Sequence, residues 1–135
     1  MSLFSGEDAH FFLVFPDASS NKYSRGVAGL LTGSDRFPGA GVLSSKGALR
    51  SGAGFCRYVG ESQFCNSLVL NSCPEMVMGI GTCDSFLIGS GISDIFQDSR
   101  CDLAKRLLAN PLMYREERGW LVLDAGGMDL ILNSS

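Results

Sequence analysis

Three segments of the chain carry glycine or aspartate directly after apolar runs, where side chains and backbone could do chemistry. They are Gly33-Ser34, Gly89-Ser90-Gly91 and Asp124. Glycine lets backbone approach a ligand closely, and free N–H groups beside a helix start can hold a phosphate or another anion. A carboxylate at a strand end is placed to bind a ribose hydroxyl. Each feature also fits a plainer explanation, since glycine permits a tight turn and aspartate caps one.

The segment Pro38-Gly39-Ala40 extends the first of these features into the start of a helix. Proline suits the first helical position, because its missing N–H would have no partner there. The glycine spacing matches neither GxGxxG nor GxxxxGK[ST], the two best-known phosphate-binding patterns. Taken alone, the two glycine segments therefore favour tight turns, and Asp124 fits a ligand contact and a cap equally well.

Composition excludes several classes of protein. The chain has 135 residues, of which 45% are hydrophobic, so it can build the core of one small domain at most. The net charge of −3 argues against broad electrostatic binding to nucleic acid. The apolar runs are too short to span a membrane, and no basic lead precedes them as in a secretory signal. We expect a cytoplasmic protein with neither nucleic acid nor membrane as partner.

The cysteines and the single histidine do not form a catalytic or metal site. No two cysteines stand two to four residues apart, which excludes a zinc ribbon and a CxxC redox motif. His10 lies near the N-terminus, and the chain has no GxSxG nucleophile motif. We therefore predict no metal site and a reducing compartment, and we assign no catalytic residue. A Ser-His-Asp triad stays formally open. The cysteines are Cys56, Cys65, Cys73, Cys83 and Cys101.

The order of apolar runs predicts an α/β fold. Strands are expected at 26–34, 55–60, 74–79, 85–91 and 120–127. Helices are expected at 38–51, with Gly52 as C-cap, at 62–72 and at 93–110, the last best supported over 101–109, and a short helical turn follows from 128. This alternation predicts a mainly parallel sheet that binds ligands at the carboxyl ends of its strands. Residues 1–25 form an arm, and the charges of Arg50, Arg57 and 100–118 are expected on a solvated face.

Several short motifs then occur in one particular order. They are Asn21-Lys22-Tyr23-Ser24-Arg25-Gly26, Gly33-Ser34, Pro38-Gly39-Ala40, Arg50-Ser51-Gly52-Ala53-Gly54, Pro74-Glu75-Met76-Val77, Gly89-Ser90-Gly91 and Leu123-Asp124-Ala125. In this order the chain resembles the ADP- or ATP-dependent NAD(P)H-hydrate dehydratases, the YjeF C-terminal-domain proteins of the ribokinase-like superfamily. The resemblance covers about residues 21–132 and implies a parallel-sheet, three-layer ribokinase-like fold.

The resemblance also implies an activity and a site. Family members remove water from hydrated NADH or NADPH, driven by hydrolysis of ADP or ATP with Mg²⁺. Ala40 and Gly91 fall where the family contacts the hydrated nicotinamide nucleotide. Gly33, Gly39 and Gly89 would shape the same crevice, and Asp124 would line its edge.

The chain departs from the family pattern at several positions. Asn21 stands in place of histidine, Ser90 in place of proline, and Gly126-Gly127 in place of Asp-Ala. The family's His-Pro-Gly-Glu segment, its nucleotide-binding loop and its GxGD segment with the catalytic aspartate do not occur in residues 1–135. We therefore expect 26–135 to be the N-terminal half of the domain, without the nucleotide site. A second polypeptide would then supply the C-terminal half.

Two alternatives remain open at this stage. A non-catalytic binding or assembly fragment is one, because an unfinished sheet leaves an edge strand that favours a partner or a homo-oligomer. A ribokinase-like small-molecule kinase is the other, although the lead at 21–26 and the segment Pro74-Glu75-Met76-Val77 argue against it.

Overall fold

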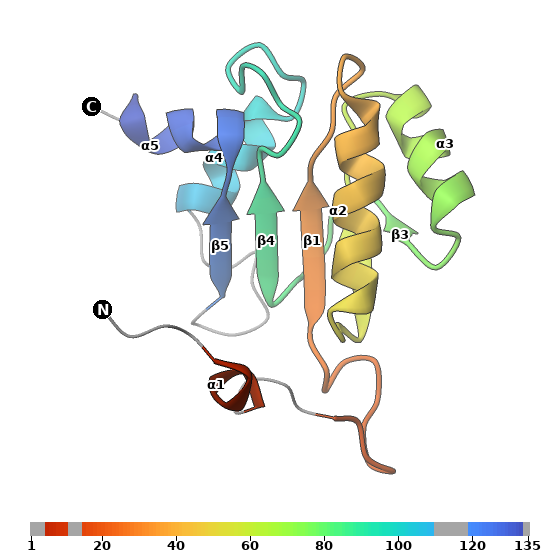
Figure 1. Cartoon of the computed structure of the whole chain (residues 1–135). Helices are drawn as coiled ribbons and strands as arrows, with labels where there is room; N and C mark the ends of the chain where they lie inside the picture. The colour runs from red at the N-terminus through yellow and green to blue at the C-terminus, as the bar shows by residue number, and fades with distance from the viewer. Residues whose placement is uncertain (1–4, 11–14, 110–118, 134–135) are drawn as a thin grey trace.

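One parallel sheet of five strands forms the centre of the molecule (Figure 1). The computed structural model describes residues 5–10, 15–109 and 119–133. The strand order is β3-β2-β1-β4-β5, and every pair is parallel. This confirms the predicted α/β class. The strands are β1 Val27–Leu31, β2 Phe55–Tyr58, β3 Val77–Met78, β4 Ser85–Ile88 and β5 Trp120–Leu123.

The central strand β1 is apolar on both faces because both faces are covered. Successive side chains of a strand point to opposite sides, so Val27 and Leu31 share one face while Leu30 lies on the other. All three are buried. Its register pairs Ala28 with Cys56 of β2 and with Ser85 of β4. A continuous apolar run of this kind is typical of strands inside a parallel sheet.

Helices cover the two faces of the sheet and make three layers. Helix α2 (Pro38–Arg50) and helix α3 (Gln63–Ser72) lie in front of β1, β2 and β3 in Figure 1. Helix α4 (Cys101–Ala109) and the short helix α5 (Asp129–Leu132) belong to the other face. Two separate clusters of buried side chains result. The front cluster is built on Leu30, Cys56, Tyr58, Val69, Cys73 and Met76, and the back cluster includes Leu31, Phe86, Ile88, Ile95, Leu107 and Leu130.

The ends of the front helices follow the local chemistry of the sequence. Helix α2 begins at Pro38, as predicted, and Ser51 is its C-cap. Gly52 was the expected cap, but it is the next residue, with a φ of 96° that favours glycine. Helix α3 begins after Ser62, whose hydroxyl oxygen accepts a hydrogen bond from the Cys65 N–H at 3.3 Å.

Several expected boundaries differ from the structure. Strands β1, β3 and β4 are shorter than the ranges 26–34, 74–79 and 85–91 expected for them. The helix expected over 93–110 begins at Cys101, because the carboxylates of Asp94 and Asp98 accept backbone N–H groups two residues on and hold turns instead. The strand expected over 120–127 ends at Leu123, where the 3₁₀ helix η2 (Ala125–Met128) begins. The N-terminal arm contains a short helix, α1 (Gly6–His10), which the sequence pattern did not indicate.

The described residues include no helix long and apolar enough to cross a membrane.

Two buried side chains of the front cluster, the Tyr58 phenol and the Cys56 thiol, should lower the free energy of unfolding in alkaline solution. Burial raises the pKa of Tyr58 from 10 to about 12 and that of Cys56 from 9 to about 11. A raised acid pKa stabilises the fold fully below the unfolded value, and this contribution is lost as pH rises through the folded value. The free energy of unfolding should therefore fall between about pH 9 and 12, by roughly 2–3 kcal/mol per group. Urea unfolding at several pH values measures this free energy. Tyr58→Phe should remove the contribution of Tyr58, which sets in above about pH 10. A constant free energy across this range would contradict the assignment.

Candidate functional site

The loops that follow β1 and β4 are joined at the carboxyl edge of the sheet. The Gly33 N–H donates a hydrogen bond to the Ser90 carbonyl at 2.7 Å. The Ser34 hydroxyl donates to the Gly91 carbonyl at 2.7 Å, and its oxygen accepts from the Phe37 N–H at 3.1 Å. Two segments nearly sixty residues apart in sequence thus form one piece of backbone at the start of α2.

Close packing at this junction requires glycine. Gly33 and Gly91 have φ angles of 69° and 77°, a region that L side chains rarely adopt. A Cβ atom on Gly91 would overlap the Cβ of Ala40 and stand 3.0 Å from the Gly33 Cα. The structure therefore brings Gly33, Ala40 and Gly91 into contact, as expected from a parallel sheet.

A second close backbone contact, between Gly89 and Asp124, lies one strand further along the same edge. Gly89 has a φ of 113°, and a Cβ there would overlap the Asp124 carbonyl oxygen. The Asp124 side chain accepts a hydrogen bond from the Ala125 N–H at 2.9 Å and caps η2. The sequence allowed Asp124 to be either a cap or a ligand contact, and the described residues show the cap. Its carboxylate is exposed. Gly39 is exposed at the start of α2, and a Cβ there would meet nothing within 4 Å.

A buried arginine donates hydrogen bonds to backbone carbonyl groups at the same edge of the sheet. Arg100 is 4% exposed and pairs with Asp98, which is 7% exposed, at 2.7 Å. Its guanidinium also donates to the Thr32 carbonyl at 3.1 Å, the Gly33 carbonyl at 2.6 Å and the Val59 carbonyl at 3.0 Å. These carbonyls follow β1 and β2. The loop that carries Arg100 is therefore bonded to the ends of two strands.

The expectation that Arg100 lies on a solvated face is wrong. Alternating charge signs predict exposure, but the carbonyl groups at strand ends need donors, and a guanidinium has five. The one local signal is the spacing of Asp98 and Arg100 just before a helix. Of the other charges in that group, Arg106 is exposed, and those of 110–118 lie outside the described residues.

A polar contact ties the loop after β1 to the start of α3. The Asp35 carboxylate accepts hydrogen bonds from the Ser62 hydroxyl and from the Cys65 thiol, the latter at 3.3 Å. The hydrogen bond from Ser62 is the main reason that the pKa of Asp35 is lowered, and the thiol adds to it. Burial and the hydrogen bond to Asp35 raise the pKa of Cys65. Both effects disfavour the thiolate form of Cys65 that a nucleophile requires.

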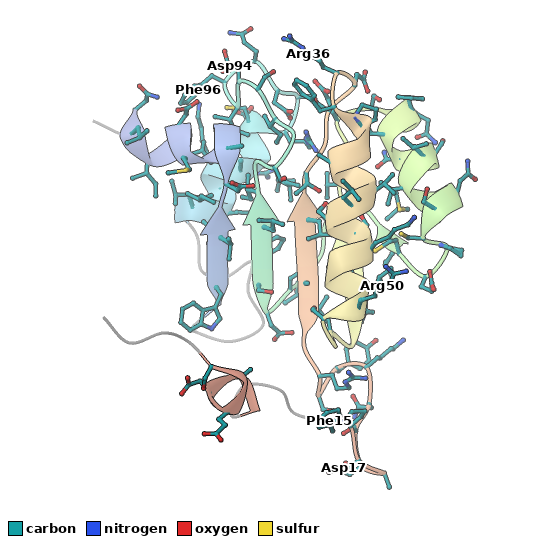
Figure 2. All side chains as sticks on the ribbon, viewed as in Figure 1. Phe15, Asp17, Arg36, Arg50, Asp94 and Phe96 are labelled. Atoms are coloured by element: carbon teal, nitrogen blue, oxygen red, sulfur yellow. The ribbon has the colours of Figure 1, made fainter. Side chains whose placement is uncertain are left out.

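The described residues show no group of side chains typical of a metal site. No three of their histidine, cysteine, aspartate or glutamate side chains are grouped so that they could hold a metal ion. Two hollows, of about 370 and 730 Å³, lie elsewhere: one between α2 and the sheet, the other at the amino ends of the strands beside Arg50. In Figure 2, Arg36, Asp94 and Phe96 mark the carboxyl edge, and Phe15 lies at the opposite end. The edge offers small residues and backbone groups, which suit close approach of a ligand.

Comparison with known proteins decides the family. The family model described as NAD(P)H-hydrate dehydratase matches residues 28–135. The chain belongs to this family. The bifunctional NAD(P)H-hydrate repair enzyme Nnr of Corynebacterium glutamicum is 42% identical over 62 residues, which are 46% of this chain and 10% of that protein.

Solved structures agree with this dehydratase assignment and with the fold. The ADP/ATP-dependent NAD(P)H-hydrate dehydratase of Bacillus subtilis, co-crystallised with ATP and Mg²⁺, matches with a TM-score of 0.72 and 27% identity. The match covers 92% of this chain and 46% of that one. A ribokinase-like superfamily protein of Enterococcus faecalis matches with a TM-score of 0.72 and 21% identity, over 88% of this chain and 43% of that one, which supports the fold. The chain therefore spans less than half the length of these relatives.

Loss of the Arg100 guanidinium should destabilise the chain strongly. Arg100→Met leaves Asp98 buried without its charged partner and removes a donor from three carbonyl groups, of which that of Thr32 keeps the Tyr58 hydroxyl. We therefore expect a loss of roughly 3–5 kcal/mol in the free energy of unfolding. Arg100→Lys should also destabilise, because one ammonium cannot reach all these partners.

The matched control is Arg106→Met on the exposed side of α4, which should change the free energy of unfolding by less than about 0.5 kcal/mol. Urea unfolding followed by circular dichroism measures all three variants. Equal effects of Arg100→Met and Arg106→Met would contradict the role of Arg100.

Proposed function

We propose that the chain supplies one half of the substrate crevice of an NAD(P)H-hydrate dehydratase. The reaction removes water from hydrated NADH or NADPH, with hydrolysis of ADP or ATP as the driving step. No electrons are transferred, because the nicotinamide ring is already reduced in the hydrate. The observation that carries the proposal is the contact among Gly33, Ala40 and Gly91 at the carboxyl edge of the sheet.

The proposed contacts divide into two groups. Ala40 and Gly91 are partly accessible and would touch the hydrated nicotinamide nucleotide. Gly33 and Gly89 are buried and would shape the crevice, while the exposed Gly39 and Asp124 would line its rim. Small residues at these positions let the ligand approach the backbone.

The rest of the site would come from a polypeptide outside residues 1–135. In our proposal 26–135 are the N-terminal half of the domain and 1–25 the arm that leads into it. The catalytic aspartate, ADP or ATP and Mg²⁺ would be bound by the other half. The five cysteines have no disulfide bonds, which supports a reducing, cytoplasmic setting.

A recovery assay tests the activity. The 135-residue chain is incubated with hydrated NADH, ADP or ATP and Mg²⁺, and the absorbance of NADH is followed. We expect no recovery from this chain alone, and recovery once a polypeptide carrying the remaining half of the domain is added. Turnover by the chain alone would disprove the incomplete site, and no recovery with the complete complex would disprove the activity.

A single substitution tests the crevice. Gly39→Leu adds bulk at the rim, where a Cβ has open space, so the chain should melt no lower than before. Its affinity for hydrated NADPH, measured by calorimetry on the complete complex, should fall about tenfold or more, which corresponds to ~1.4 kcal/mol. Ser67→Leu, at an exposed position of α3, is the control and should leave the affinity unchanged. Equal affinities of the two variants would remove Gly39 from the crevice.

A further inference from the structure

The described helices cover only half of the front face of the sheet. Helices α2 and α3 lie over β1, β2 and β3, but no helix of the described residues lies in front of β4 and β5 (Figure 1). Leu87, Trp120 and Val122 point to this face, and the latter two are 76% and 54% exposed. Parallel sheets are found almost only with both faces covered, so this face requires a partner.

A groove runs along this bare face beside α2. It has a volume of about 370 Å³, and none of the residues that line it is charged. The helix side contributes Ser44, Gly47 and Ala48, and the sheet side contributes Ala28, Leu87 and Val122. A wall of small residues opposite an apolar floor fits the apolar face of a helix.

Exposed residues of α2 next to the groove give a second indication of a neighbouring helix. Gly39, Leu43 and Gly47 recur every four residues and are exposed, with Leu43 at 72%. A Cβ on Gly47 would meet nothing within 4 Å, so the glycine is not required by the packing of the described chain. A mid-helix glycine costs up to about 1 kcal/mol relative to alanine, and close approach of another element would offset this cost.

The edge of the sheet next to the groove also has no partner strand among the described residues. Within the described residues β5 pairs with β4 alone, so its other edge presents unpaired N–H and C=O groups. Such an edge accepts a further strand through backbone hydrogen bonds. The groove and the edge are continuous at Val122, which lies in both.

We propose that the groove and the β5 edge together bind the second half of the family domain. That half would place one amphipathic helix in the groove alongside α2 and one strand against β5. The length of the relatives supports this occupant, because the chain covers only 46% of the Bacillus subtilis enzyme. The inference rests on the proposed function for the identity of the occupant.

Photocrosslinking in cells that produce the protein tests the surface. p-Benzoylphenylalanine is placed at Val122 in the groove, and at Ser67 on α3 as the control. We expect Val122 to crosslink to a peptide whose sequence matches the part of the dehydratase family beyond the present match, and Ser67 not to do so. A crosslink from Val122 to a second copy of this chain, to an unrelated protein or to nothing would overturn the proposal.

A steric variant provides the second measurement. Gly47→Leu fills the groove and should lower the Val122 crosslink yield at least tenfold, while the melting temperature of the chain stays equal or rises. Ser67→Leu should leave the yield unchanged. An unchanged yield in a folded Gly47→Leu variant would overturn the helix site.

The recovery of NADH by the captured complex separates this inference from the proposed function. A complex with the expected Val122 crosslink but no recovery keeps the surface and disproves the activity. Recovery without that crosslink disproves the surface and keeps the activity.

Discussion

The guanidinium of Arg100 is the interaction on which the carboxyl edge depends. It uses its five N–H donors on Asp98 and on the carbonyl groups of Thr32, Gly33 and Val59. Burial makes these bonds costly to lose, because neither the carbonyl groups nor the Asp98 carboxylate could turn to water. Tyr58 donates to the same Thr32 carbonyl at 2.8 Å and links the front cluster to the group. The positions of the loops after β1, β2 and β4 are therefore fixed by one side chain.

The close packing of Gly33 and Gly91 depends on the fixed positions of those loops. Gly33 and Gly91 each need a left-handed backbone, and each leaves room for the other loop. The carbonyl of Gly33 is also a partner of Arg100. A rigid polar network below and tightly packed backbone above leave an edge made of small residues. Such an edge offers its shape and its backbone groups for the close approach of a ligand.

Sequence patterns predicted the parts of the fold that depend on local chemistry. Apolar runs located all five strands, Pro38 located the start of α2, and parallel topology explained why Gly33, Gly91 and Asp124 share one edge. Boundaries were less accurate where a side chain bonds to nearby backbone, as Asp98 does before α4 and Asp124 does after β5. The role of Arg100 was missed for another reason. Its main partners are backbone carbonyls as many as 68 residues away, and a carbonyl leaves no mark in the sequence.

The position of β1 in the centre of the sheet has a consequence for how the chain acquires its fold during synthesis. β1 bonds to β2 on one side and to β4 on the other, and the Val27 N–H is held by Asp84, 57 residues later. A ribosome must therefore release β4 before the first strand has both neighbours. Until then the apolar back face of β1 has no cover, since α4 follows later still. Closing so long a loop slows folding, and the nascent chain is exposed to aggregation or chaperone capture during this interval.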